Sequence, residues 1–193
     1  MKKNKKKLFS EIPTLRGERV TLKPLEPADA EALGELANDP EVYKYLPTFL
    51  FEQKYDDPQT VIAHLYDECI RDSLILGVFT EEGFCGLAEV YGYRAPLLKA
   101  SVGYRLLPRC WGKGIATEAL GLLVKYLLEE TDVEVITAST MLANKASAKV
   151  LKKNGFRHVA HAVPENWGYA LPTLTDKWIL TGIGYRREYR FQT

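Results

Sequence analysis

The sequence is poor in cysteine, histidine and long apolar runs, and each shortage excludes a class of protein. It has three cysteines and three histidines in 193 residues. Cys69, Cys85 and Cys110 form no CxxC pair and lie near no histidine pair, so we expect neither a disulfide scaffold nor a zinc finger. We expect buried, unreactive thiols and a cytoplasmic, reducing location. No run of 18 apolar residues occurs, so we expect no membrane span.

A strong excess of charge of one sign is also missing. The chain has 26 basic and 25 acidic residues, but five lysines lie within the first seven positions. The remaining residues therefore carry 21 basic against 25 acidic groups, which argues against a protein that binds the nucleic-acid backbone. The lysine run fits either contact with an anionic partner or a solvated tail, and we favour the tail. No apolar segment follows it, so it does not begin a signal peptide.

Hydrophobic residues make up 46% of the chain and charged residues 26%, which is typical of one globular domain. We predict a basic, flexible tail over 1–14, a single domain over 15–181 and an extension over 182–193, which covers a sheet edge or meets a second subunit. Apolar periodicity predicts strands over 19–24, 73–80, 84–92, 100–107, 134–139, 156–163 and 174–180, and helices over 27–37, 57–70, 115–130 and 145–154. This order predicts a mixed α/β sheet with helices on both faces.

The turn before the helix that begins at Ile115 has the features of an anion-binding site. Gly112 and Gly114 permit positive φ and leave no Cβ in the way of an anion. The first N–H groups of the helix have no partner within it, and its dipole adds partial positive charge there. Arg109 and Lys113 add charge at the same place, so the turn is predicted to hold a pyrophosphate.

The spacing excludes two common phosphate loops. A nucleoside-triphosphate loop needs an earlier glycine and a hydroxyl residue after the lysine, and here Gly114 follows Lys113. A dinucleotide fingerprint needs a third glycine, where this chain has Thr117. The segment 109–114, RCWGKG, instead matches the pattern Arg/Gln-x-x-Gly-x-Gly/Ala in full.

With this pattern the chain resembles the GNAT superfamily of acyl-CoA-dependent N-acetyltransferases, and most of all the branch of Rim-type ribosomal-protein N-terminal acetyltransferases. Further marks of that branch are LRGERVTLKP at 15–24, GIATEAL at 114–120, NKAS at 144–147 and VLKKNGF at 150–156. The resemblance covers about residues 15 to 180. It implies an α/β GNAT fold with a mostly antiparallel, splayed sheet, and it implies acetyl-CoA as cosubstrate.

The resemblance also implies which residues bind acetyl-CoA. The pantetheine arm would lie in the gap beside the strand that ends at Leu106 and Leu107, and the pyrophosphate would lie on the amides of the turn. Asn144 would hold the pantetheine, and it is also a good helix N-cap. The predicted cofactor-binding residues are Leu106, Leu107, Arg109, Trp111, Gly112, Lys113, Gly114, Ile115, Ala116, Thr117, Asn144 and Ser147.

Acetylation of an amine needs a neutral amine, a stabilised oxyanion and a protonated leaving thiolate. Glu89 is the candidate base, acting through water, or else a solvent-facing strand residue. A backbone N–H near Leu106 and Leu107 is the candidate oxyanion donor. Ser147, as the resemblance suggests, or Tyr104 would protonate the thiolate, although Tyr104 also fits a packing role.

The acceptor pocket is expected between the first two helices and the final strand pair, lined by the aromatic stretch 43–55 and the loop 161–175. Its acids Asp56, Asp57 and Glu165 would attract a cationic amine. His64, His158 and His161 show no ligand spacing with carboxylates or cysteines, so no metal is predicted.

The sequence thus predicts an enzyme that acetylates a primary amine, either a protein N-terminus or a small molecule, by direct attack in a ternary complex. The alternative is an inactive acyl-CoA-binding domain that serves as a sensor or interaction module. Neither nucleic acid nor membrane is an expected partner, and the chain is expected to be a monomer or a homodimer.

Overall fold

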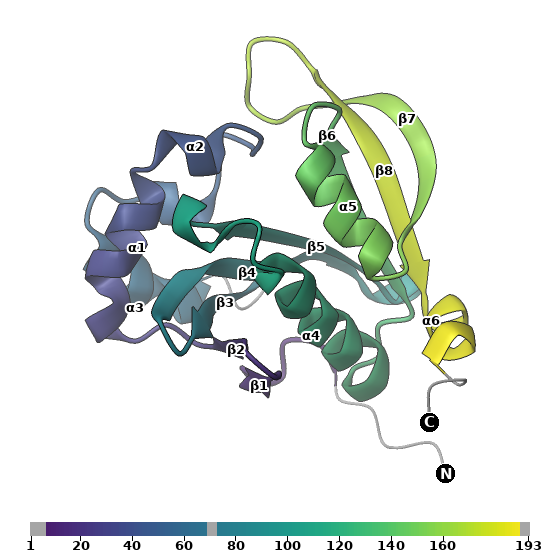
Figure 1. The fold of residues 1–193 in the computed structure, drawn as a ribbon, viewed down its shortest axis with the longest axis horizontal. Helices are drawn as coiled ribbons and strands as arrows, with labels where there is room; N and C mark the ends of the chain where they lie inside the picture. Colours follow the sequence, from purple (N-terminus) through teal and green to yellow (C-terminus); the bar gives the residue numbers. More distant parts are fainter. Residues whose placement is uncertain (1–6, 69–72, 190–193) are drawn as a thin grey trace.

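In a computed structural model, which describes residues 7–68 and 73–189, the chain folds around one eight-stranded sheet (Figure 1). The strands are β1 (Leu15–Arg16), β2 (Thr21–Lys23), β3 (Ser73–Thr80), β4 (Gly83–Arg94), β5 (Lys99–Leu106), β6 (Val135–Met141), β7 (Arg157–Glu165) and β8 (Thr173–Thr181). The helices are α1 (Ala30–Ala37), α2 (Pro40–Tyr43), α3 (Pro58–Glu68), α4 (Ile115–Glu130), α5 (Lys145–Lys153) and α6 (Gly182–Tyr189). Short 3₁₀ turns include η2 (Phe51–Gln53) and η5 (Pro108–Cys110).

The sheet is mixed and mostly antiparallel. Its strand order is β1-β2-β3-β4-β5-β6-β8-β7, and of the seven neighbouring pairs only β5 and β6 run parallel among the residues described. The predicted strands and long helices are confirmed to within a few residues, and the last two residues of the helix predicted over 57–70 lie outside the described residues. Sequence periodicity missed β1 and α2, which at two and four residues are too short to show a period, and it also missed α6.

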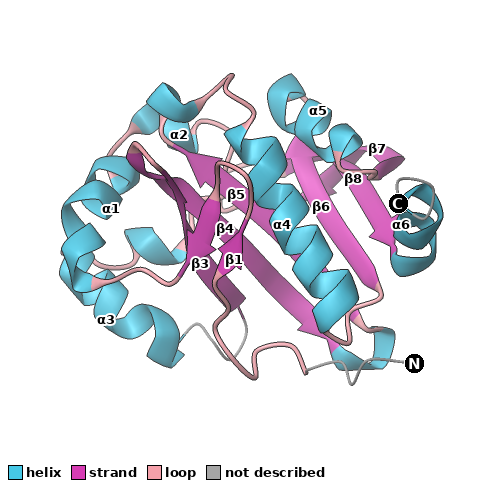
Figure 2. Ribbon diagram, turned by 60° about the horizontal axis from the view of Figure 1, so that its bottom comes forward, coloured by secondary structure: helices cyan, strands magenta, loops and turns pink. Residues whose placement is uncertain are grey.

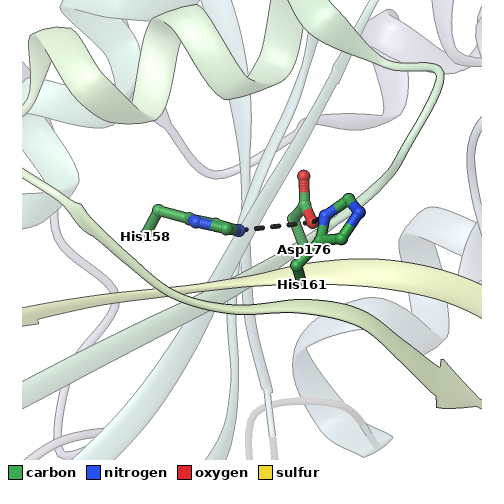
Figure 3. Close-up of side chains that lie close together, drawn as sticks. All are labelled: His158, His161 and Asp176. Carbon is green, nitrogen blue, oxygen red and sulfur yellow. Dashed lines mark hydrogen bonds and ion pairs between the residues drawn. The ribbon is translucent and has the colours of Figure 1, made fainter.

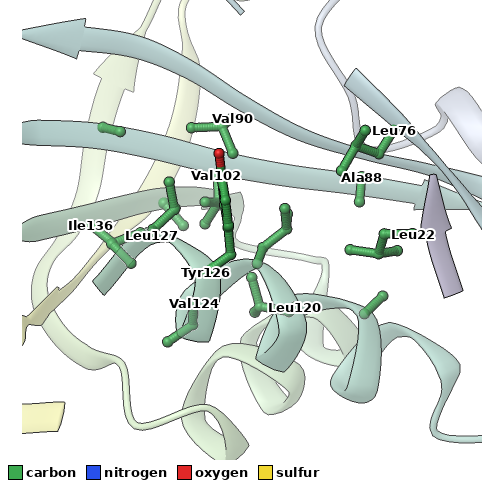
Figure 4. Packing of buried hydrophobic residues seen from close by; sticks show 14 of the residues in the cluster. Leu22, Leu76, Ala88, Val90, Val102, Leu120, Val124, Tyr126, Leu127 and Ile136 are labelled. Atoms are coloured by element: carbon green, nitrogen blue, oxygen red, sulfur yellow. The ribbon is translucent and has the colours of Figure 1, made fainter. Parts of the chain in front are cut away.

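Helices cover both faces of the sheet, as predicted (Figure 2). Figure 4 shows apolar side chains of α4, among them Leu120 and Leu127, packed against sheet residues such as Val90 on one face. The other face packs against α1, α2 and α3 through side chains such as Leu33 and Val61. The two buried clusters thus cover opposite faces of the central strands β3 and β4.

The segment after β8 folds back on the same chain. It forms α6, whose Tyr185 hydroxyl donates to Glu129 of α4 at 3.0 Å. Arg186 forms an ion pair with Glu134 at 3.3 Å, at the start of β6. These contacts are intramolecular and hold α6 at the end of the sheet remote from the α4 N-terminus.

Two cysteines are buried, as predicted, and burial together with the nearby Cys85 raises the pKa of the Cys110 thiol to about 12. Cys69 and the first six residues of the lysine tail lie outside the described residues. In the described part of the chain, no helix combines the length and the apolar character needed to cross a bilayer.

Candidate functional site

Strands β5 and β6 diverge at one end of the sheet. β5 pairs with β6 only where Lys99–Ser101 meets Val135–Thr137. Beyond that point β5 continues along β4 as far as Leu106, and β6 continues along β8 as far as Met141. The divergence opens a cavity of about 1100 Å³, which the free edges of both strands line. The predicted splay of the sheet is therefore present.

The glycine turn forms one wall of this cavity. Gly112 and Gly114 adopt φ of +72° and +83°, the left-handed region that the sequence predicted for them. Gly114 is the N-cap of α4, so the first amides of that helix point out of the turn. A Cβ placed on Gly112 would meet no atom within 4 Å, which leaves room for a ligand against the backbone.

Most of the predicted residues lie along this one cavity. The lining includes Glu89, Tyr104, Leu106, Trp111, Gly112, Gly114, Ile115, Ala116, Thr117, Asn144 and Ser147. The Trp111 indole N–H donates to the Leu106 carbonyl at 2.7 Å, so the side chain bridges the turn and the end of β5.

Three predicted cofactor residues do not line the cavity. The side chain of Leu107 is buried, and its N–H donates to the Cys85 carbonyl at 2.9 Å, so that amide is no longer available to an oxyanion. The Arg109 guanidinium pairs with Glu35 of α1 and also donates to the Phe84 carbonyl. Lys113 pairs with Glu82 at 3.5 Å. The partners of Arg109 and Lys113 lie far from the turn in the sequence, and spacing alone could not bring them to it.

Ser147 and Tyr104, which come from different elements, meet in the cavity. Their hydroxyl oxygens are 2.9 Å apart. Asn144 caps α5 by accepting a hydrogen bond from the Ser147 amide at 3.0 Å, which fixes the first turn of the helix and the serine with it. Burial raises the pKa of Tyr104 to about 12, although the hydrogen bond with Ser147 opposes the shift. Tyr104 is therefore a neutral hydroxyl at physiological pH.

Glu89 belongs to a buried charge network that the sequence did not reveal. Its Oε2 accepts a hydrogen bond from Arg105 Nη1 at 2.9 Å. Arg105 Nη2 donates to Glu52 Oε2 at 2.5 Å, and the Tyr43 hydroxyl donates to Glu52 Oε1 at 2.9 Å. Burial alone would lower the pKa of Arg105, but the two carboxylates outweigh it and raise that pKa. The network ties the segment before α3 to β5.

The opposite end of the cavity is aromatic and acidic. Tyr45, Phe49, Phe51 and Trp167 line it together with Glu41 and Glu165. The loop between β7 and β8 closes this end, because the Thr48 amide donates to the Trp167 carbonyl at 2.9 Å and the Tyr169 hydroxyl donates to the Leu46 carbonyl at 2.7 Å. The expected walls of the acceptor pocket thus come together.

Two of the three acids expected in that pocket are elsewhere. Asp57 caps α3 through hydrogen bonds from the Gln59 and Thr60 amides, and neither it nor Asp56 lines the cavity. Glu165 does line it. Burial raises the pKa of Glu165, but hydrogen bonds from Lys177 and Thr175 outweigh burial and lower it, so Glu165 is ionised at neutral pH.

Sequence reasoning missed Lys149 and Lys153 of α5, which also line the cavity. They lie four residues apart and therefore on one face of the helix. Lysines at this spacing in a predicted amphipathic helix were the available signal. They bring positive charge to the cavity from α5, in place of the charge expected from Arg109 and Lys113.

Comparison with known proteins decides the family. The family described as acetyltransferase (GNAT) domain matches residues 19–157. The chain belongs to the GNAT acetyltransferase family. An uncharacterised N-acetyltransferase of Bacillus licheniformis, p20, is 32% identical over 151 residues, which cover 76% of this chain and 83% of the relative.

Solved structures show the same GNAT fold. RimJ from Mycobacterium smegmatis, solved with a CoA disulfide, has a TM-score of 0.76 at 20% identity, with 88% of each chain covered. Spermidine N-acetyltransferase from Vibrio cholerae, solved with CoA and spermine, has a TM-score of 0.72 at 19% identity, covering 88% of this chain and 99% of that one. The resemblance to the GNAT superfamily is therefore confirmed, and the Rim-type branch is among the structural neighbours.

Proposed function

We propose that this GNAT protein transfers the acetyl group of acetyl-CoA to a primary amine by direct attack in a ternary complex. One observation carries the proposal. A single cavity joins the amide-rich turn before α4, the Ser147–Tyr104 hydroxyl pair and an acidic, aromatic end. Both substrates therefore have a place in one continuous space, with a pair of proton donors between the two ends.

The cofactor end suits the phosphates of acetyl-CoA. The left-handed turn is open at Gly112, where an added Cβ would meet no atom within 4 Å, and it would leave the first amides of α4 available to a pyrophosphate. Lys149 and Lys153 supply positive charge from α5. The unpaired part of β5, up to Leu106, would run beside the pantetheine arm.

The chemistry of the central residues follows from their protonation and geometry. The amine nitrogen bonds to the acetyl carbon, the carbon–sulfur bond breaks, and the departing sulfur needs a proton. Neutral Tyr104, in contact with Ser147, is placed to give that proton, and its raised pKa keeps it a donor up to alkaline pH. Glu89 would accept the amine proton through water while Arg105 holds its carboxylate in position.

The acceptor end favours a cationic amine. Carboxylates of Glu41, Glu89 and Glu165 line the cavity together with several aromatic rings, a combination that would attract an ammonium group by charge and by cation–π contact. A protein N-terminus is the easier nucleophile, because an α-amino group has a pKa of about 8 and loses its proton more readily than a lysine or polyamine group. Spermine, which is bound in the solved spermidine N-acetyltransferase, is the first small amine to test beside an N-terminal peptide.

The test is release of free thiol from acetyl-CoA in the presence of an N-terminal peptide or of spermine. Ser147→Ala and Tyr104→Phe should lower kcat by about 10²-fold or more while leaving acetyl-CoA affinity within a few fold. Ser101→Ala is the matched control, because Ser101 and Thr137 also form a hydroxyl pair at 2.9 Å but lie where β5 and β6 are still paired. Its kcat should stay near that of the wild type.

The inactive-domain alternative gives a different result. A sensor or interaction module would bind acetyl-CoA but release no thiol above the uncatalysed rate with any amine. Turnover that is unaffected by Ser147→Ala and Tyr104→Phe would refute the proposed proton donors while leaving the transferase activity in place.

A further inference from the structure

A cluster of metal-ligand side chains lies outside the cavity, on the hairpin of β7 and β8. His158 and His161 come from β7 and Asp176 from β8, and one potential ligand atom of each lies within 4.8 Å of the others. Figure 3 shows both imidazole rings directed at the Asp176 carboxylate. His158 Nε2 is 3.2 Å and His161 Nδ1 is 2.6 Å from Asp176 Oδ1.

The backbone of β7 is bent in the way that brings these rings together. Residues three apart in a regular strand point to opposite faces, so His158 and His161 would normally diverge. Here the register against β8 shifts twice, between His158 and Ala160 and between Ala160 and Val163. Ala162 adopts φ of +53°, which is strained for a residue with a Cβ. The bulges re-aim His161 to the side of His158, and this is why sequence spacing gave no sign of a ligand set.

The surroundings favour a fixed site over a chance contact. The His158 ring packs on Trp178, with ring centroids 5.0 Å apart, and Trp178 is itself buried and donates to Thr140 at 3.0 Å. Asp176 is only 14% exposed, whereas the His161 side chain is 68% exposed. Two donors are thus held by the fold, and the third closes the set from the solvent side.

We propose that His158, His161 and Asp176 bind a divalent transition-metal ion of the Zn²⁺ class, with water completing the coordination. Two imidazoles and one carboxylate are borderline nitrogen and oxygen donors, which suit Zn²⁺ and its neighbours and do not suit Mg²⁺ or Ca²⁺. In a tetrahedral zinc site, donors about 2.1 Å from the metal lie about 3.4 Å apart, close to the 3.2 Å between His158 Nε2 and Asp176 Oδ1. The ion would take the place of the direct contact between His161 Nδ1 and Asp176 Oδ1.

A metal at this place would fasten the two strands that carry the acceptor-side loop. The β7–β8 loop reaches the segment 46–48 through Trp167 and Tyr169. Cross-linking β7 to β8 should therefore stabilise the folded hairpin without adding a group to the cavity. The expected signature is a higher thermal midpoint in the presence of the ion.

The experiment is a Zn²⁺ titration of the full chain, without a polyhistidine tag, in competition with a chromophoric chelator. We expect one ion per chain, and a loss of affinity of at least about tenfold in His161→Gln and in Asp176→Asn, because even removal of an outer-shell partner costs 10- to 100-fold. His64→Gln is the matched control, since His64 is the remaining histidine and lies on α3 against Tyr55. Its affinity should equal that of the wild type.

Two further readouts make the outcome decisive. Zn²⁺ should raise the thermal midpoint of the wild type and of His64→Gln, and should not raise that of Asp176→Asn. Imidazole NMR signals of His158 and His161 should move on titration while those of His64 stay. No saturable binding at one ion per chain would overturn the proposal. Binding that survives both ligand substitutions would belong to other groups, such as the thiols, and would overturn it equally.

Discussion

The buried ion pair between Arg105 and Glu52 gives a prediction with a calculable size. Both side chains are at most 2% exposed, and Arg105 also contacts Glu89. Glu52→Gln keeps the shape of the side chain but removes the charge that compensates a buried guanidinium. Removing one partner of a buried ion pair costs about 3–5 kcal/mol. We expect a loss of about 3 kcal/mol here, because the glutamine keeps an amide oxygen and Glu89 still contacts Arg105.

The chain provides its own control for this estimate. Arg109 and Glu35 form the same chemical pair, but their side chains are 51% and 53% exposed. Glu35→Gln should therefore cost about 0–1 kcal/mol. A domain of this kind has a free energy of unfolding of about 5–15 kcal/mol, so the first loss is large and the second barely detectable.

The assay is urea unfolding followed by circular dichroism, with the free energy of unfolding extrapolated to water for each variant. Adding Arg105→Gln to Glu52→Gln should recover part of the loss, because it removes the cation that the first substitution leaves unpaired. Equal losses for Glu52→Gln and Glu35→Gln would refute the reasoning from burial. Strictly additive losses in the double variant would refute the pairing itself.

Three further predictions concern pH and the acceptor loop. Hydrogen bonds from the Arg19 and Val20 amides outweigh burial and lower the pKa of Glu118. The Glu118 carboxylate therefore stabilises the fold above the pKa that glutamate has in the unfolded chain, and this stabilisation is lost as the pH falls through the lowered pKa. The difference in unfolding free energy between wild type and Glu118→Gln should therefore shrink from pH 7 to pH 3; a constant difference would contradict this. Because the pKa of Tyr104 is about 12, ionisation of Tyr104 should not lower the rate below about pH 11. A pH–rate profile checks this, and a decline below that pH that is present in the wild type and missing in Tyr104→Phe would contradict it. Gly168→Ala should raise KM for the amine and leave acetyl-CoA affinity unchanged, since its Cβ would lie 1.9 Å from Thr48 Oγ1 and push the loop away; an unchanged KM would show that the loop does not bound the acceptor.

The elements of the fold were predictable where the signal is local. The helix from Ile115 to Glu130 has apolar residues at helical spacing and two glycines before it, and the structure places α4 over that range. The left-handed turn at Gly112 and Gly114 follows from residue type alone. The splay between β5 and β6 does not, because no residue property marks where pairing stops; it came from the family resemblance.

The side chains that lie away from the cavity and the charge network that was not predicted share one cause. Arg109 is adjacent to the glycine turn in sequence, but Glu35, which is 74 residues earlier, holds its guanidinium. Arg105 lies in an alternating strand that reads as ordinary, and Glu52, its buried partner, is 53 residues away in an irregular segment. Such long-range charge pairs depend on tertiary packing, and composition and spacing carry no information about them. The bulges of β7 that bring His158 and His161 together could not be predicted from the sequence for the same reason.

The most direct test of the whole account is a calorimetric titration of acetyl-CoA into three forms of the chain. These are the wild type, Gly112→Asp/Gly114→Asp and the neutral control Gly112→Asn/Gly114→Asn. Asparagine and aspartate impose the same left-handed strain and similar volume at φ of +72° and +83°, so the two variants differ in charge and, at position 114, in an ion pair with Arg19, whose Nη2 lies 3.1 Å from the Cβ position. The account predicts saturable binding by the wild type, loss of binding in the folded aspartate variant and clearly weaker impairment in the asparagine variant. Absence of binding by the folded wild type, or equal binding by the aspartate and asparagine variants, would contradict the assignment of this turn as the pyrophosphate site.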